Sequence, residues 1–165
     1  MIKFEKVSLN QFLKSCEDLG LEYSKSDLKE IYDRISLPKR GTSGSAGYDF
    51  VTPFGFELKD NETETLPTGI RVLLPQDKVL LLVPRSGLGF KTGMSLANTI
   101  GVIDSDYAYS DNEGHIMMKF TGGFQNCKVK EFERVMQGII VKFYITEDDN
   151  VTTTRNGGFG STGEK

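Results

Sequence analysis

Most of this chain has the hydrophobic pattern of short β-strands. Residues 2–7 alternate between apolar and polar side chains, which is the period of a half-buried strand. From Pro38 onward, apolar runs separated by Gly, Pro, Asn and Asp recur at intervals of about ten residues. These runs are TGIRVLLP, KVLLLVP, GHIMMKF and QGIIVKFYI. The spacing is typical of an all-β sandwich or barrel, and the flanking prolines Pro75 and Pro84 favour a jelly roll of short strands.

The period changes to that of amphipathic helices in residues 8–36. Ser8 can cap a helix that Gly20 ends, and Ser24, three residues before Asp27, can cap a second helix. The apolar side chains at helical spacing are Leu9, Phe12, Leu13 and Cys16 in the first helix and Leu28, Ile31, Tyr32 and Ile35 in the second. We therefore expect a short helical insertion near the N-terminus that lies outside the jelly roll.

Length and charge restrict the class of protein. The chain has 165 residues, of which 38% are hydrophobic and 26% charged, so residues 1–165 suit one globular domain with a full core. The net charge is -3. Binding to nucleic acid or to an anionic membrane requires basic patches, so we expect neither partner.

The cysteine and histidine content argues against metal or disulfide frameworks. Cys16 and Cys127 are far apart in the sequence and His115 is the single histidine, so no zinc motif can be assembled within one chain. The N-terminus lacks the pattern of a signal peptide, and no apolar run reaches membrane-spanning length. We expect a cytoplasmic protein.

Two segments suit an anionic, flat ligand. After a strongly apolar run, Arg85, Ser86 and Gly87 bring together a cation, a hydroxyl and accessible backbone N–H groups, which could hold a phosphate; a plain surface turn would use the same residues. The final residues, 155–165, read RNGGFGSTGEK and form either a nucleotide lid or a disordered tail. A lid would use Arg155, Ser161 and Thr162 toward phosphates and Phe159 as a stacking face, with Gly160 between them.

The segment ANTIGVIDSDY carries two carboxylates. Asp104 and Asp106 stand at i and i+2, so on an extended chain they point the same way. Asp104 follows the apolar pair Val102-Ile103, and a carboxylate fixed there can accept a proton from water and make it a nucleophile. Asn98, on the incoming strand, suits the hydrogen-bonding edge of a base. The alternative is an aspartate-rich turn that closes a hairpin.

Two further polar positions lie next to predicted strands. Asp49, in SAGYDF, could orient the water shell of a divalent cation or cap a turn. Gln137, together with Glu133 and Arg134, stands at the entry to the last strand, where a solvated face is the simpler interpretation for Glu133.

The five segments together resemble the trimeric deoxyuridine triphosphatase (dUTPase) family. SAGYDF, PRSGLGFK, GVIDSDY, ERVMQGII and RNGGFGSTG occur in the order and approximate spacing of that family's five motifs. The resemblance implies a distorted jelly roll of the β-clip type, a homotrimer with active sites at subunit interfaces, and Mg²⁺-dependent hydrolysis of dUTP to dUMP and pyrophosphate. The Mg²⁺ would be held by substrate phosphates and water, without protein ligands.

The resemblance also implies roles for individual residues. Asp104 would be the general base, with Asp49 and Gln137 as further catalytic residues. Tyr107 would pack on the deoxyribose, where its ring excludes a 2′-hydroxyl. The remaining substrate-binding positions are Arg85, Ser86, Gly87, Asn98, Val102, Ile103, Met117, Arg155, Phe159, Gly160, Ser161 and Thr162.

Two features depart from the family pattern, and two alternative functions stay open. The helical insertion is one departure, and the other is the stretch AYSDNE between Tyr107 and Gly114, where the common pattern is shorter. A dCTP deaminase of the same superfamily is the alternative enzyme. The alternative of a different class is a regulatory interaction module that nucleotide binding switches.

Overall fold

A five-stranded antiparallel sheet is the largest sheet of the described structure. The computed structural model describes residues 1–153. The sheet has the order β2 (Lys39–Arg40), β3 (Tyr48–Val51), β12 (Arg134–Lys142), β7 (Lys78–Pro84), β9 (Gly101–Ile103). β12 and β7 pair along seven consecutive positions, from Met136 opposite Pro84 to Lys142 opposite Lys78. β7 contains the predicted run KVLLLVP and β12 contains most of the predicted run QGIIVKFYI, so both strands are confirmed.

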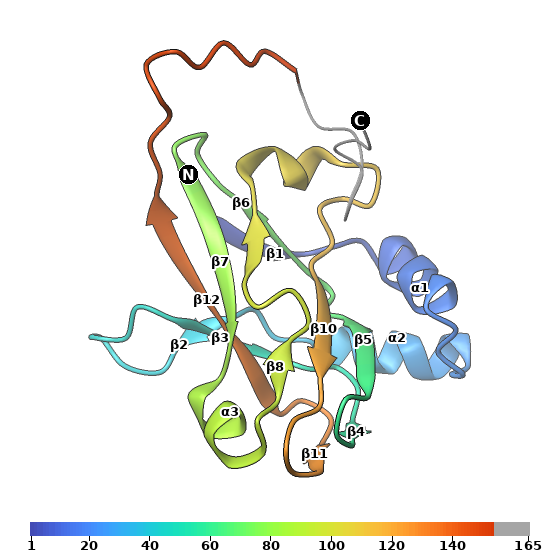
Figure 1. Cartoon of the computed structure of the whole chain (residues 1–165). Coiled ribbons are helices and arrows are strands. Elements are labelled where there is room, and N and C mark those ends of the chain that lie inside the picture. Colours follow the sequence, from blue (N-terminus) through green and yellow to red (C-terminus); the bar gives the residue numbers. More distant parts are fainter. Residues whose placement is uncertain (154–165) are drawn as a thin grey trace.

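Smaller antiparallel sheets pack against this one (Figure 1). β5 (Thr63–Pro67), β10 (Met117–Thr121) and β8 (Ser95–Leu96) form one of them, and β4 (Phe56–Leu58) pairs with β11 (Cys127–Val129). The predicted N-terminal strand, β1 (Lys3–Lys6), pairs with β6 (Ile70–Leu73). The result is the expected all-β fold of short strands.

Both predicted helices form, and they begin at the predicted caps. The Ser8 hydroxyl accepts the Gln11 N–H at 3.1 Å before α1 (Leu9–Asp18), and the Ser24 hydroxyl accepts the Asp27 N–H at 3.1 Å before α2 (Lys25–Arg34). Two short helices were not predicted: α3 (Ser86–Thr92) and the 3₁₀ helix η1 (Ser105–Tyr109). Each helix in residues 1–153 is too short or too polar to cross a bilayer.

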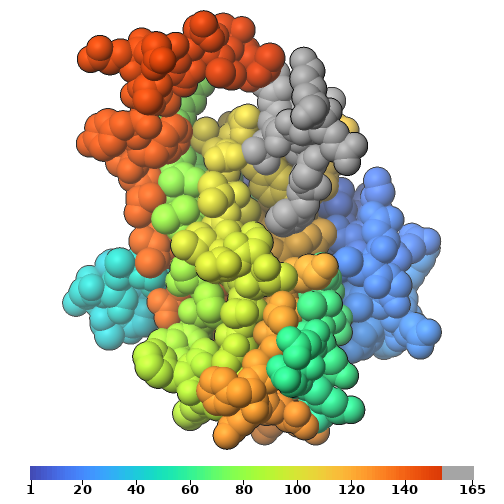
Figure 2. Space-filling view, in the orientation of Figure 1, coloured from blue at the N-terminus to red at the C-terminus, as the bar shows by residue number. Residues whose placement is uncertain are grey.

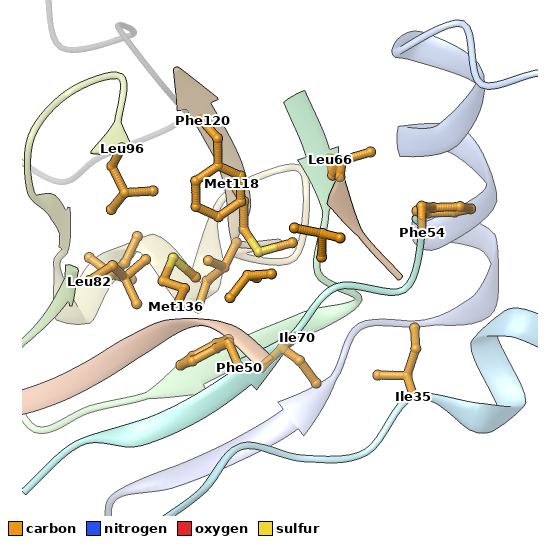
Figure 3. Close-up of a cluster of buried hydrophobic side chains, with 14 of the residues drawn as sticks. Ile35, Phe50, Phe54, Leu66, Ile70, Leu82, Leu96, Met118, Phe120 and Met136 are labelled. Atoms are coloured by element: carbon orange, nitrogen blue, oxygen red, sulfur yellow. The ribbon is translucent and has the colours of Figure 1, made fainter. Parts of the chain in front are cut away.

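The helices α1 and α2 lie beside the strands but share their core. Figure 2 shows these two helices, in blue, against the green segment that includes β5. Phe12 of α1 has no exposed surface, and its ring stacks on that of Phe54, with 6.1 Å between centroids. Ile35, at the end of α2, lies in the same cluster as Phe54 and Ile70 (Figure 3). The predicted insertion is therefore part of a common hydrophobic core.

A buried histidine joins the helices to the strands. His115 is fully buried, and its Nε2 accepts the Gly69 N–H at 2.8 Å, so this nitrogen carries no proton. Its Nδ1 lies 2.8 Å from the Ser15 hydroxyl and carries the proton of the neutral ring. Burial lowers the pKa of His115 to about 4, against an opposing effect of the Glu113 carboxylate. A second proton, on Nε2, would make this nitrogen a donor that faces the Gly69 N–H, so the hydrogen bond between them would be lost.

The neutral histidine predicts a specific loss of stability in acid. Between pH 6.5 and 4 the unfolded chain takes up a proton at His115 that the folded chain does not. The free energy of unfolding should therefore fall by about 3 kcal/mol as the pH drops through this interval. Urea unfolding at several pH values measures the slope. His115→Gln should be less stable at pH 7 but should lose this part of the slope; an unchanged slope would contradict the assignment.

Candidate active site

A carboxylate on β3 lies between two guanidinium groups. Asp49 Oδ2 is 3.1 Å from Arg134 Nη1, and Asp49 Oδ1 is 3.5 Å from Arg85 Nε. Asp49 is directly opposite Gln137 in the β3–β12 pairing. Three predicted site residues are thus neighbours, and the structure adds Arg134, which the sequence placed at the entry to the last strand without a site role. The two cations outnumber the carboxylate, so this cluster, called here the arginine cluster, suits an anion.

Gly47 of the SAGYDF segment has a steric role beside this cluster. A Cβ atom at position 47 would lie 2.5 Å from Gln137 Oε1. Any larger residue would displace the Gln137 side chain. The glycine therefore permits the close approach of the two strands' polar side chains.

Arg85 stands at the junction of β7 and α3. Its backbone N–H donates to the Val135 carbonyl at 3.0 Å, which fixes the end of β7 to β12. Ser86 and Gly87 form the first turn of α3, and a Cβ at Gly87 would meet open space. The sequence predicted a cradle or a turn at this position, whereas the chain forms a short helix that ends at Gly93 with φ +75°.

A cavity of about 520 Å³ opens among β5, β8, β9 and β10. Three predicted binding residues line it: Asn98, Ile103 and Met117. Gly101, whose backbone was expected beside Asn98 at the base, also lines it. The other lining residues, which the sequence did not indicate, are Leu19, Thr65, Leu82, Leu96, Ala97, Lys119 and Met136. The wall is mainly apolar with few polar groups, as in sites that bind a flat organic ring. Leu19 comes from the end of helix α1.

Side chains alternate between the two faces of β9, so two predicted binding residues lie on opposite faces. Ile103 is 4% exposed and faces the cavity, whereas Val102 is 56% exposed and does not line it. Val102 therefore presents its side chain on the opposite face of β9.

The chain turns directly after Asp104. Asp104 is the N-cap of η1 and Asp106 lies in the first turn of that 3₁₀ helix. The expectation that both carboxylates point the same way from an extended chain is wrong, because the segment is helical from Ser105 onward. Asp104 alone keeps the position at the end of β9, next to the cavity-lining Ile103.

Tyr107 is nearly buried, and its hydroxyl is held within the chain. Tyr107 Oη donates to the His115 carbonyl at 2.8 Å and accepts from Asn112 Nδ2 at 2.8 Å. The backbone reverses at Gly114, with φ +69°, where a Cβ would lie 2.6 Å from Ala108 Cα. The sequence AYSDNE thus forms a compact turn around the tyrosine.

The arginine cluster and Asp104 lie far apart within one chain. Leu80 pairs with Ile103, so Asp104 lies near the start of β7 and Arg85 follows its end. At about 3.3 Å per residue the two are separated by roughly 20 Å along the strand. Figure 1 shows α3 at the bottom of the molecule and the segment of η1, in dark yellow, at the top.

The last predicted site residues lie beyond the part of the chain that the structure describes. They are Arg155, Phe159, Gly160, Ser161 and Thr162. Within residues 1–153, the structure gathers no group of three or more His, Cys, Asp or Glu side chains able to hold a metal ion.

The dUTPase family model matches residues 33–163. The chain belongs to the dUTPase family. The match favours a dUTPase, a hydrolase, over the alternative dCTP deaminase. It begins within α2, so β1 and α1 precede it.

Individual dUTPases support this assignment. The deoxyuridine 5′-triphosphate nucleotidohydrolase of Lactococcus lactis subsp. lactis is 38% identical over 135 residues, which cover 78% of this chain and 89% of that protein. That of Mannheimia succiniciproducens is 35% identical and covers 86% of this chain and 99% of that protein. The crystal structure of dUTPase from Streptococcus mutans superimposes with a TM-score of 0.64 at 30% identity, covering 87% and 98% of the two chains.

A dUTPase from phage phi11 of S. aureus shares the fold at 18% identity. Its TM-score is 0.63, and the match covers 93% of this chain and 97% of that one. Together with the S. mutans structure, this likeness supports the jelly-roll type of fold expected from the sequence.

Proposed function

We propose that this dUTPase hydrolyses dUTP to dUMP and pyrophosphate in sites formed between the subunits of a homotrimer. The observation that carries the proposal is the separation of the arginine cluster from Asp104. Within one chain, Asp104 ends β9 beside the nucleoside pocket, whereas Arg85 of the anion site lies about 20 Å away along β7. A second copy can bring its anion site to the first copy's pocket, as in heterologous assemblies that close into rings.

The cavity would receive the base and sugar. Asn98 offers amide groups to the edge of uracil, while Ile103 and Met117 enclose the ring with apolar surface. Tyr107 would limit the space at the sugar 2′ position, and Val102, on the outer face of β9, would contact the assembled neighbour. A pocket of this kind rejects a wrong base because its polar groups would be left unpaired.

Asp104 would act as the general base. Its carboxylate accepts a proton from water while the water oxygen bonds to the α-phosphorus and the bond from that phosphorus to the leaving pyrophosphate oxygen breaks. The reaction needs no covalent intermediate. Both cysteines are buried, and burial raises the pKa of Cys16 to about 12, which makes it a poor nucleophile.

The arginine cluster would bind the triphosphate. Arg85 and Arg134 supply positive charge, Ser86 and Gly87 supply hydrogen-bond donors, and Gln137 supplies an amide. Asp49 is already bound by two guanidinium groups, so it suits a contact to the water shell of a cation better than direct ligation. Mg²⁺ on the phosphates would offset the charge that opposes attack by water.

The C-terminal residues would complete the site over the bound nucleotide. Arg155, Ser161 and Thr162 carry hydrogen-bond donors that would contact the phosphates. The ring of Phe159 would stack on the base, and Gly160 would allow the backbone to approach closely.

The test is pyrophosphate release from dUTP, dCTP, dTTP and UTP, each with Mg²⁺ and with excess chelator. We expect release from dUTP alone among the four, and its loss on chelation. Sedimentation of the same sample should give three chains per particle. Tight binding of dUTP without pyrophosphate release would contradict the proposal and favour the regulatory module.

A further inference from the structure

The two departures from the family pattern are bonded to each other. Glu113, in the lengthened turn, accepts the Ser8 N–H at 2.7 Å and the Ser8 hydroxyl at 2.6 Å. Ser8 is the N-cap of α1, so the carboxylate also lies at the positive end of that helix. Burial would raise the pKa of Glu113, but the Ser8 hydrogen bonds together with the charges of Arg71 and His115 outweigh it, and the pKa is lowered. The turn is thus fixed to α1 by a charged group.

A second connection runs through the interior. Ser15, in the middle of α1, accepts the His115 Nδ1–H at 2.8 Å and a Gln11 amide N–H at 3.0 Å. The carbonyl of the same His115 accepts the Tyr107 hydroxyl at 2.8 Å. Ser15, His115 and Tyr107 are all nearly or fully buried, so these bonds have little competition from water. A short chain of hydrogen bonds therefore joins α1 to the tyrosine.

The far end of α1 reaches the cavity itself. Leu19, the C-cap of the helix, lines it together with Met117. Helix α1 is thus held at its start by Glu113 and in its middle by His115, and its end lies against the cavity wall. In this position it can fix the shape of the pocket. This element precedes the family match and was expected to lie outside the catalytic domain.

We infer that α1 belongs to the nucleoside-binding apparatus and that Ser15 and His115 are positioning residues that hold Tyr107 against the sugar. The inference rests on the proposed function, because Tyr107 contacts deoxyribose only if the cavity binds dUTP. The positioning residues contribute to selectivity against the ribonucleotide without touching it.

The test is the ratio of kcat/KM for dUTP to that for UTP. A folding defect lowers the active fraction for both substrates equally and leaves this ratio unchanged, whereas a displaced Tyr107 lowers it. Ser15→Ala should lower the ratio about tenfold, since a hydrogen bond lost at a buried histidine corresponds to about one decade. Asn10→Ala is the matched control: Asn10 is an exposed residue of α1, bordering the groove with α2, and this variant should keep the ratio.

A second variant guards against failure of the first to fold. Glu113→Gln keeps the size of a partly exposed side chain and weakens the charged bonds to Ser8, so it should lower the ratio about threefold. A wild-type ratio in Ser15→Ala, or in Glu113→Gln where the first variant does not fold, would overturn the inference, as would an equal loss in Asn10→Ala. Absence of pyrophosphate release by the wild type is a different result, which refutes the proposed function.

Discussion

Asp104→Asn should fold and bind dUTP but lose turnover by roughly 10² to 10⁴-fold, the usual contribution of a positioned general base. The carboxamide has nearly the same shape but cannot accept the proton of the attacking water. Asp104 caps η1 without a side-chain hydrogen bond to the backbone of that helix, so the substitution should not unwind it. Pyrophosphate release measures turnover, and calorimetry with the non-hydrolysable analogue dUpNHpp measures binding.

The control for this variant is Asp111→Asn. Asp111 is exposed in the turn that follows η1, and the substitution removes the same charge a few residues away. We expect near-normal turnover from it. Near-normal turnover in Asp104→Asn would refute the assignment of the base, and loss of dUpNHpp binding in the same variant would point to a binding role instead.

Two inactive variants should restore activity when they assemble together. Arg85→Ala removes the anion site at the end of β7, and Asp104→Asn removes the base at the opposite end. If each site takes Asp104 from one subunit and Arg85 from another, about a quarter of the sites in randomly mixed trimers contain both groups. The two chains, co-refolded in equal amounts, should therefore recover about a quarter of wild-type turnover, far above either variant alone.

The double variant, with both substitutions in one chain, provides the control for this mixture. Co-refolded with the wild type in the same proportion, it should again leave about a quarter of the sites intact. Turnover in the mixture of wild type and double variant, without turnover in the mixture of the two single variants, would mean that both groups of a site come from the same chain. That result would contradict the interface proposal.

The local features of the fold could be predicted from the sequence. The caps at Ser8 and Ser24, and the strand that ends at Pro84, depend on side chains within a few residues of one another. Helix α3 could not be predicted in this way, because two glycines in its seven residues lower its helix propensity and contacts with other segments must stabilise it.

The site was predictable by residue type but not by arrangement. Asp49, Gln137 and Arg85 were selected individually, yet the pairing of Arg134 with Asp49 depends on strands 85 residues apart. The direction of the Asp106 side chain depends on the 3₁₀ helix η1, and the local sequence Asp-Ser-Asp does not by itself predict such a helix. Leu19 was assigned only to a helix, since nothing near it in the sequence indicates a cavity.

The common core of helices and strands fixes where this protein can be divided. The family-model match begins at residue 33, but the physical folding unit begins with β1, which pairs with β6, and includes Phe12 and Ile31. A fragment that begins at residue 33 would leave β6 as an open edge and expose the apolar surface under both helices, which is the condition for edge-to-edge aggregation. Replacing residues 9–36 by a Gly/Ser linker would expose the same surface. For this chain, the start of the family-model match and the start of the stable domain are different positions.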